Sequence, residues 1–392
     1  MNKSGRKIKV AHIITRLIVG GAQENTIYTV VGLNRMPQYD VTLFTGPQAG
    51  AEGSLMEGDW KNEVPCVVLN NMRRNLTWRD AIMYRQLINI FRTEKYDIVH
   101  THSSKAGILG RLAAQKAGVP VIIHTIHGLP FHEYQNVFVR RFYIYSERKA
   151  ARSCDKIISV ADTMTRKALA AGVGTPELFT TIYSGMELDL FLNSAVHRNP
   201  IRKQLGIADD EIVIGKIARL FYLKGHEYLF SAAKEILDKL PKTRFLLLHD
   251  GILRQKFEKQ LNDMGIRDKF IFAGIVPPTD IPKYIAAMDI LVHTSLREGL
   301  ARTLPQALAC GKPVVSFDID GAPEVVKNGE TGFLVKPMDT KGLSAALIRL
   351  MQNESLRRKM GENGRKLVDP IFRSEYMVEK IHELYQEILR QK

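Results

Sequence analysis

The stretch SLREGLARTLPQALACGKP, which runs from Ser295 to Pro313, indicates more about fold and chemistry than any other part of the chain. Glu298 is followed directly by a glycine and by a short segment suited to a helix, and Gly-Lys-Pro then leads into the apolar pair Val314-Val315. A carboxylate accepts hydrogen bonds from sugar hydroxyls, a helix N-terminus favours negative charge, and glycine lets a ligand approach the backbone. The stretch suits a phosphorylated, polyhydroxylated ligand. The alternative is an ordinary helix whose first turn Glu298 caps.

On both sides of this stretch, short apolar segments alternate with helical patterns. The predicted strands are Ile8–Ile14, Val41–Phe44, Ile98–His102, Val121–Thr125, Ile212–Ile217, Phe245–Leu248, Ile290–His293 and Pro313–Phe317. The predicted helices include Gln23–Leu33, Lys105–Ala117, Glu227–Lys239, Leu253–Met264 and Thr340–Met351. This alternation predicts an α/β protein whose parallel sheets are covered by helices on both faces. Such sheets bind ligands at the carboxyl ends of their strands.

The length of 392 residues favours two domains, because single cores rarely grow this large. The run from Leu192 to Pro200 is polar, contains proline and lacks periodicity, as expected of a linker. We therefore predict two Rossmann-like, doubly wound domains at residues 1–190 and 212–369, facing each other across a cleft and joined by a linker at 191–211. Residues 370–392 read as an amphipathic helix with apolar positions that include Tyr376, Val378, Ile381 and Tyr385.

Composition excludes several classes of protein. Hydrophobic residues make up 45% and charged residues 25% of the chain, which is typical of a globular protein. The first 21 residues imitate a signal peptide, but His12 and Arg16 interrupt the apolar run and Gly20-Gly21 ends it early. Three widely spaced cysteines offer no disulfide framework, which favours a reducing cytoplasm.

The net charge of +15 favours an anionic partner. Between Lys105 and Arg152 there are eight basic residues and two acidic ones. Within that segment, aromatic and basic residues alternate at helical spacing from Phe138 to Lys149, as in helices that lie on an anionic membrane. The alternative, slightly favoured for each aromatic, is an amphipathic helix whose Phe138, Phe142 and Tyr145 face the core.

Two loops of the first half follow predicted strands. Gly20 and Gly21 lie between the first strand and the first helix but do not form the Gly-x-Gly-x-x-Gly fingerprint, which argues against a dehydrogenase. His127 precedes a glycine at the end of another strand, where it is well placed to hydrogen-bond a ligand. His100 and His102 raise the possibility of zinc, but no cysteine is close in sequence, and alternate strand positions share a face in any case. No metal is assigned.

A third loop, at the start of the second half, carries Arg219 and Lys224. Their spacing lets a planar guanidinium and a mobile ammonium converge on one diphosphate, although charged loop residues are usually just solvated. The loop lacks the P-loop pattern, so a P-loop nucleotidase is not expected. Asp318-Ile-Asp320 resembles a metal-binding pair, but a turn followed by a helix N-cap is the simpler interpretation.

Together these segments resemble the retaining family 4 glycosyltransferases of the GT-B fold. The resemblance covers nearly the whole chain, and its motifs are specific in their order and spacing. They are Gly20-Gly21-Ala22, His124–Gly128, Ser184–Phe191, Arg219 with Lys224-Gly225, Asp250-Gly251, Glu298–Pro313, Gly321 with Glu324, and Thr331-Gly332-Phe333.

The resemblance implies a role for each matching residue. Arg219 and Lys224 would bind the donor diphosphate and stabilise it as it leaves. Glu298 would orient hydroxyls of the donor sugar, with Gly299 and the amides of Leu300 and Ala301 near its ring and phosphates. His127 would lie across the cleft near the sugar and the attacking acceptor, and Gly20-Gly21 would let the first loop close over the diphosphate. The family transfers a sugar from a nucleotide diphosphate with retention, without a bound metal or another cofactor. The resemblance also implies that the C-terminal helix, residues 370–392, packs back on the first domain.

The sequence departs from the family pattern at Gln306, at Ala301-Arg302, where the family has Gly-Leu, and at His249, where the family has a glycine. Gln306 stands where the family has a second glutamate that bonds the ribose hydroxyls. An amide still forms such bonds, but without charge, so nucleotide preference is expected to differ. With Glu298, Arg219 and Lys224 all present, an active hexosyltransferase is expected.

The segments His100–Arg111 and His124–Gly128 resemble capsule and exopolysaccharide members of the family in particular. This resemblance implies an anionic, lipid-diphosphate-linked sugar as acceptor. It also implies a cytoplasmic protein positioned peripherally at the inner face of the membrane, and nucleic acid is not an expected partner. Two alternatives remain: another GT-B enzyme such as a nucleotide-sugar epimerase, and a non-catalytic nucleotide-sugar-binding subunit.

Overall fold

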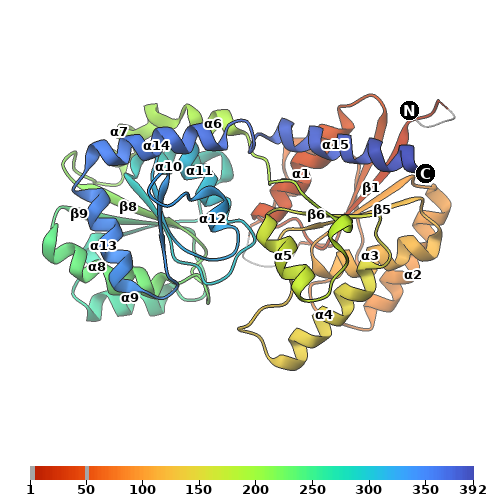
Figure 1. Cartoon of the computed structure of the whole chain (residues 1–392), viewed down its shortest axis with the longest axis horizontal. Coiled ribbons are helices and arrows are strands. Elements are labelled where there is room, and N and C mark those ends of the chain that lie inside the picture. Colours follow the sequence, from red (N-terminus) through yellow and green to blue (C-terminus); the bar gives the residue numbers. More distant parts are fainter. Residues whose placement is uncertain (1–4, 49–52) are drawn as a thin grey trace. The chain divides into compact units, whose positions relative to one another are not determined.

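The chain folds into two compact α/β units (Figure 1). A computed structural model describes residues 5–48 and 53–392. The first unit extends to Met186 and also includes Phe372–Lys392, whereas the second comprises Glu187–Ile371. The predicted fold class, α/β with two parallel sheets, is confirmed.

The first unit is built on a parallel sheet of seven strands in the order β3-β2-β1-β4-β5-β6-β7. The strands are β1 Ile8–Ile14, β2 Tyr39–Thr45, β3 Cys66–Val68, β4 Ile98–His102, β5 Val121–Ile126, β6 Lys156–Ser159 and β7 Phe179–Thr181. The order reverses at β1, which pairs with β2 on one side and with β4 on the other. Strand order in doubly wound sheets reverses where ligands bind, at the carboxyl ends of the strands.

Helices cover both faces of this sheet. They are α1 Gly21–Asn34, α2 Arg79–Glu94, α3 Ser104–Ala117, α4 Val137–Ala151, α5 Asp162–Ala170 and α15 Ser374–Gln391, with short 3-10 turns η1 Asp59–Asn62 and η2 Pro176–Leu178. Alternate residues of β1 explain the two layers. Val10 packs in a cluster with residues of α1 and α15, whereas Ile13 packs on the other face with residues of α2 and α3.

The second unit contains six parallel strands in the order β10-β9-β8-β11-β12-β13. They are β8 Ile212–Ile217, β9 Thr243–Leu248, β10 Phe270–Gly274, β11 Ile290–His293, β12 Val314–Phe317 and β13 Gly332–Val335. The helices are α6 Leu188–Leu192, α7 Arg198–Gln204, α8 His226–Lys239, α9 Arg254–Asp263, α10 Ile281–Ala287, α11 Thr303–Ala309, α12 Ala322–Val325, α13 Thr340–Met351 and α14 Glu354–Val368. The 3-10 turns are η3 Ser194–His197, η4 Arg267–Lys269 and η5 Pro278–Asp280.

Residues 191–211 do not form the irregular linker that the sequence predicted. They form the end of α6, then η3 and α7, and they belong to the second unit. Phe191 and Ile201 are buried, and the buried Arg202 donates hydrogen bonds to the carbonyls of Ala208 and Glu211. The prediction of a linker was wrong because these helices are short and few of their side chains enter the core, so their composition is as polar as that of a loop.

The C-terminal helix α15 packs against α1 in the first unit. Its buried residues include Met377, Ile381 and Tyr385, spaced by four, whereas Tyr376 on the other side is 38% exposed. The apolar stripe that the sequence predicted therefore exists, but Tyr376 does not belong to it. Because α15 reaches the sheet, residues far apart in sequence meet in one core.

Candidate functional site

In the second unit, the predicted donor residues lie in the loops that follow β8 and β11, except for Gln306, which lies in α11. Arg219 and Lys224 belong to the loop that joins β8 to α8. The loop is fixed against the end of β11, because the amide of Leu296 donates to the carbonyl of Leu223 and Thr294 Oγ1 donates to that of Gly225. A Cβ at Gly225, whose φ is +65°, would lie 1.9 Å from the Thr294 oxygen. Only glycine permits this close approach, so the position of Lys224 beside the end of β11 depends on a glycine at position 225.

Lys224 and Glu298 form the central ion pair of this site. Lys224 Nζ lies 2.6 Å from Glu298 Oε1, and each side chain is 22% exposed. His293, at the end of β11, places its Nε2 3.6 Å from the same carboxylate oxygen. The main-chain amide of Glu298 donates to Asp320 Oδ2 at 2.6 Å, which ties the loop after β11 to the loop after β12.

The charge state of Glu298 follows from these neighbours. Burial alone would raise the pKa of Glu298, but the Lys224 charge and the contacts with His293 and Lys224 outweigh it and hold the pKa well below its usual range. Burial lowers the pKa of His293, so its imidazole is neutral at pH 7. The site therefore presents a carboxylate and an ammonium side by side, which suits a ligand with both hydroxyls and phosphates.

A second lysine, Lys216, lies beneath this pair and was not singled out by the sequence reasoning. It is 1% exposed, and its Nζ donates to Thr294 Oγ1 at 2.8 Å. Burial, aided by the Lys224 charge, lowers the pKa of Lys216 to about 7. A lysine inside the otherwise apolar strand Ile212–Ile217 was the available signal, because lysine is almost never fully buried without a partner.

Arg219 lies in the same loop, with its guanidinium over the Phe221 ring at 5.2 Å from the centroid. The next loop, Asp250-Gly251, packs against it, since the amide of Leu220 donates to the carbonyl of Asp250. A Cβ at Gly251 would lie 2.4 Å from the Leu220 oxygen, which explains a glycine there.

The stretch around Glu298 differs in two ways from the sequence interpretation. Helix α11 begins at Thr303 and not directly after Glu298, and Gly299 and Leu300 are buried, so the predicted exposed glycine amide at a helix start is wrong. Glu298 does not cap α11 either, because its carboxylate pairs with Lys224. Ala301 precedes the helix and Gln306 lies within it, 9% exposed. The predicted N-cap role of the Asp318–Asp320 turn is also wrong: α12 has Gly321 at its N-cap, and Asp320 binds the Glu298 amide.

The other predicted residues, Gly20, Gly21 and His127, belong to the first unit. Gly20 has extended backbone at φ 171°, and α1 begins at Gly21. His127 follows β5, partly buried, with its Nε2 3.1 Å from Nδ1 of His102. Both loops follow strands at the end of the sheet where ligands bind.

The first unit also contains a cavity of about 370 Å³ beside these loops. It lies where β1 and β4 end and where α3 begins, and its lining includes the basic residues Arg16, Arg74 and Lys105 together with the apolar Leu76 and Phe142.

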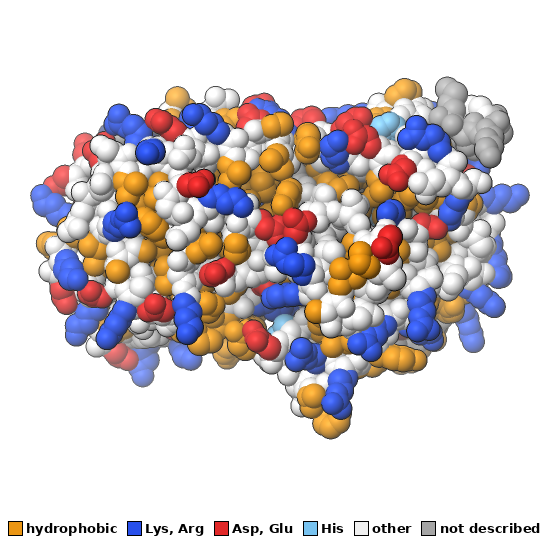
Figure 2. All heavy atoms as spheres, in the orientation of Figure 1, with side chains coloured by type: hydrophobic (Ala, Val, Ile, Leu, Met, Phe, Trp, Pro, Cys, Tyr) orange, Lys and Arg blue, Asp and Glu red, His pale blue; other side chains and the backbone are white. Residues whose placement is uncertain are grey.

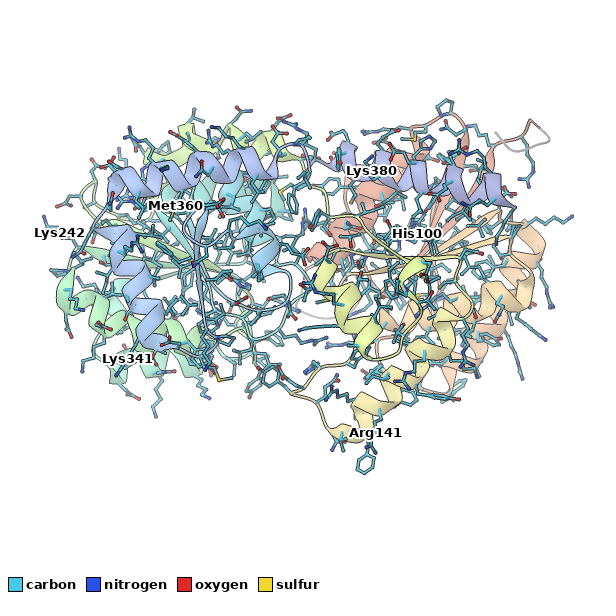
Figure 3. All side chains as sticks on the ribbon, in the orientation of Figure 1. His100, Arg141, Lys242, Lys341, Met360 and Lys380 are labelled. Atoms are coloured by element: carbon cyan, nitrogen blue, oxygen red, sulfur yellow. The ribbon has the colours of Figure 1, made fainter. Side chains whose placement is uncertain are left out.

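Helix α4 does not bury its aromatic residues, contrary to the slightly favoured interpretation. Phe138, Phe142 and Tyr145 are 74%, 51% and 66% exposed. Figure 2 shows hydrophobic and basic side chains together on the projecting part of α4, and Arg141 lies on its outer side in Figure 3. The helix is held instead by Glu147, whose carboxylate accepts from the buried Arg111 at 2.6 Å.

One group of histidines bears on metal binding, and the helices bear on membrane insertion. Within the described residues, His12, His100 and His102 are the histidines close enough together to hold a metal ion. His127 does not belong to this group. Among the helices of residues 5–48 and 53–392, none is long and apolar enough to cross a bilayer.

Each of the two units matches a known protein family. Residues 20–183 match the glycosyl transferase 4-like domain, and residues 197–367 match glycosyl transferases group 1. The UDP-Gal:alpha-D-GlcNAc-diphosphoundecaprenol alpha-1,3-galactosyltransferase of Escherichia coli is 29% identical over 99% of both chains. The capsular polysaccharide biosynthesis glycosyltransferase CapM of Staphylococcus aureus is 26% identical over 85% of this chain and 87% of that one.

Solved structures agree on the fold. Sucrose-phosphate synthase from Thermosynechococcus elongatus superposes with a TM-score of 0.83 at 21% identity, covering 98% of this chain and all of that one. HepE of Anabaena, solved in complex with UDP-glucose, superposes with a TM-score of 0.81 at 22% identity, covering 97% of this chain and 100% of that one. With both domain models matched in order, the chain belongs to the family 4 glycosyltransferases of the GT-B fold.

Proposed function

We propose that this glycosyltransferase moves a hexosyl residue from a nucleotide diphosphate sugar to a lipid-diphosphate-linked sugar, with retention and without a bound metal. The observation that carries the proposal is the Lys224–Glu298 pair, 2.6 Å apart and only partly exposed at the carboxyl ends of β8 and β11. The carboxylate can therefore bind the sugar hydroxyls while the neighbouring cation binds the phosphate to which that sugar is bonded.

Each group has one task in this proposal. Lys224, together with Arg219, binds the diphosphate and stabilises the charge that develops on it as the bond to the sugar breaks. Glu298 accepts hydrogen bonds from the sugar hydroxyls and so orients the anomeric carbon. The buried Lys216, whose Nζ donates to Thr294, adds only a partial positive charge at pH 7, because its pKa is about 7.

Bond making and bond breaking balance without a further reagent. The bond between the anomeric carbon and the β-phosphate oxygen breaks, and the acceptor hydroxyl oxygen bonds to the same carbon on the same face. The hydroxyl proton passes to the departing phosphate oxygen. The products are a nucleoside diphosphate and the extended saccharide. We propose His127 as the catalytic residue that the first unit contributes.

The acceptor proposal rests on charge and on a relative. The Escherichia coli relative is named for a diphosphoundecaprenol acceptor. In this chain, the cavity offers the guanidinium groups of Arg16 and Arg74 for a diphosphate, whereas Lys105 in the same lining already pairs with Asp80 at 2.5 Å. The apolar residues Leu76 and Phe142 offer a surface for the first part of a lipid. We place the acceptor diphosphate there.

The exposed aromatics and arginines of α4 support a peripheral position on an anionic, cytoplasmic membrane face. Such helices bind by burying apolar side chains at the headgroup boundary while basic residues face anionic lipid. Phe138→Ser should lower sedimentation with anionic vesicles at low salt. Val196→Ser is the matched control, because Val196 is equally exposed, at 75%, but lies in the second unit. Equal loss in both variants, or no sedimentation of the wild type, would contradict the membrane role.

The first test of donor binding is thermal stabilisation by a panel of nucleotides and nucleotide sugars in the presence of EDTA. A ligand that binds only the folded state raises the melting temperature by mass action. One nucleoside diphosphate and its sugars should raise the melting temperature of the wild type but not that of Lys224→Met. Lys242→Met serves as the control, since Lys242 pairs with Asp210 on the surface. Stabilisation that requires divalent metal would contradict metal independence.

The second test is turnover on a lipid-diphosphate-linked sugar. Arg74→Ala should raise the acceptor KM and leave thermal stabilisation by the donor unchanged. Arg73→Ala should leave both quantities unchanged, because Arg73 is exposed but does not line the cavity. An unchanged acceptor KM in Arg74→Ala would contradict the placement of the acceptor diphosphate in this cavity. The configuration at the new bond, read by NMR, decides retention.

A non-catalytic nucleotide-sugar-binding subunit is the second candidate. Gln306 favours it, because this residue stands where the family pattern has a glutamate. Turnover by the purified chain alone would exclude that candidate, and consumption of donor without any acceptor would instead indicate an epimerase or hydrolase.

A further inference from the structure

A chain of hydrogen bonds runs through the core of the first unit and ends at His127. His127 Nε2 lies 3.1 Å from Nδ1 of His102, and His102 Nε2 lies 2.9 Å from Nδ1 of His12. His12 Nε2 lies 3.4 Å from the hydroxyl of Tyr385 on α15. We call His102, His12 and Tyr385 the relay.

The Tyr385 hydroxyl also contacts a further histidine. It lies 2.6 Å from Nδ1 of His100, whose Nε2 lies 2.7 Å from Thr125 Oγ1. Three neighbouring strands and one helix therefore contribute to the arrangement: β1, β4, β5 and α15. Figure 3 shows His100 inside the first unit, among these elements.

The imidazoles of the relay are neutral at pH 7. His12, His100, His102 and Tyr385 are all fully buried. Burial lowers the pKa of His12 to about 3, and burial together with the neighbouring histidines lowers those of His100 and His102 well below the ordinary value. Burial raises the pKa of Tyr385 well above its usual value, so the hydroxyl keeps its proton.

Neutrality gives the chain a direction. A neutral imidazole carries one N–H and one lone pair, so each ring that accepts on one nitrogen must donate from the other. Tyr385 has a single proton, and its shorter contact, 2.6 Å against 3.4 Å, assigns that proton to His100. His12 then donates from Nε2 to Tyr385, His102 donates from Nε2 to His12, and His127 donates from Nε2 to His102.

We propose that Tyr385 of the C-terminal helix fixes the tautomer of His127 through His12 and His102, holding the proton on Nε2 and the lone pair on Nδ1. The relay thus acts as an orienting acceptor for His127, a role that a carboxylate or a carbonyl fills for many functional histidines. Tyr385 is a positioning residue here, since it touches neither donor nor acceptor. The consequence for catalysis rests on the proposed function of His127, whereas the tautomer itself does not.

A metal site is the competing explanation of the cluster. Nitrogens of His12, His100 and His102 lie within 4.8 Å of one another. However, both nitrogens of each of these rings already have a hydrogen-bond partner, and a metal ion would have to displace those partners. The relay explains the cluster without an ion.

The test is ¹⁵N NMR of protein labelled at histidine nitrogens, with the His127 signals identified from their loss in His127→Gln. Wild-type His127 should show a protonated Nε2 and an unprotonated Nδ1. Tyr385→Phe removes the hydroxyl that accepts from His12, and the His127 nitrogen shifts should move towards a mixture of tautomers. Unchanged His127 shifts in Tyr385→Phe, or a protonated Nδ1 in the wild type, would overturn the proposal.

Tyr39→Phe is the matched control. Tyr39 is buried and bonds through its hydroxyl to His382 and Gln386, also on α15, but it lies outside the relay. This variant loses a comparable tyrosine–helix contact, so it should lower stability while leaving the His127 shifts unchanged. Equal changes in His127 from both variants would assign the effect to loosening of α15 and overturn the relay.

Kinetics provide a second readout. Tyr385→Phe should lower kcat roughly 10-fold or more with little change in donor KM and should shift the pH profile, whereas Tyr39→Phe should leave the profile unchanged. If the wild type shows no turnover, the proposed function fails, but the NMR result still decides the relay. Displacement of the three ring signals by added Zn²⁺ would overturn the relay in favour of a metal site.

Discussion

Replacing Lys224 by methionine tests whether the ion pair in the second unit is both structural and functional. The variant keeps most of the side-chain volume and removes the charge. In the wild type, Nζ lies 2.6 Å from Glu298 Oε1, and both side chains are 22% exposed. The gross attraction of such a pair is about 6 kcal/mol at an effective dielectric constant near 20, but desolvation of both ions cancels most of it.

The net stabilisation is that of a charged hydrogen bond, about 2 kcal/mol. Lys224→Met should therefore lower the free energy of unfolding by about 2 kcal/mol at pH 7, measured by urea denaturation. Lys242→Met is the control. Lys242 Nζ lies 2.5 Å from Asp210, but these side chains are 73% and 59% exposed, so no measurable change is expected.

The effect also has a defined pH dependence. The Glu298 pKa in the folded wild type lies well below the value of about 4.3 in an unfolded chain. The stabilisation is therefore complete above about pH 4.3 and is lost as pH falls towards the folded-state pKa. The stability difference between wild type and Lys224→Met should be smaller at pH 3 than at pH 7. A difference that does not shrink on acidification, or equal losses in both lysine variants, would refute the reasoning.

Three further predictions concern buried groups. Because the folded-state pKa of Lys216 is about 7 and the unfolded value about 10.4, wild-type stability should rise by up to about 1.4 kcal/mol per pH unit between those values, and Lys216→Met should remove that rise in urea melts at pH 7 and 9. Glu147→Ala leaves Arg111 charged and buried and should cost about 3–5 kcal/mol, whereas Glu147→Gln, which still accepts a hydrogen bond, should cost less in the same melts. Gly225→Ala would force a Cβ against the Thr294 carbonyl at positive φ and should cost more than about 1 kcal/mol and abolish thermal stabilisation by the donor; a normal donor response would contradict the packing argument.

Much of the fold could be predicted from local sequence. The strands Ile8–Ile14, Ile98–His102, Ile212–Ile217 and Ile290–His293 have the bounds that the sequence predicted, and each begins directly after a charged residue that marks its start. Short strands such as Cys66–Val68 were not predicted, since three residues give no periodicity to recognise. The exposed aromatics of α4 were misjudged because a helical pattern states which residues share a face but not which face meets the core.

The sequence by itself determined the alternation of strands and helices and the family, and it singled out Lys224 and Glu298 as separate candidates for binding phosphate and sugar. Only the tertiary structure decided that these two side chains touch and that Lys216 lies buried beneath them. It also decided that Tyr385 meets His12, a residue 373 positions away in the chain. The physical reason is that local pattern records which face of an element is apolar. Contacts between polar groups depend instead on how strands and helices stack, and burial then fixes their charge.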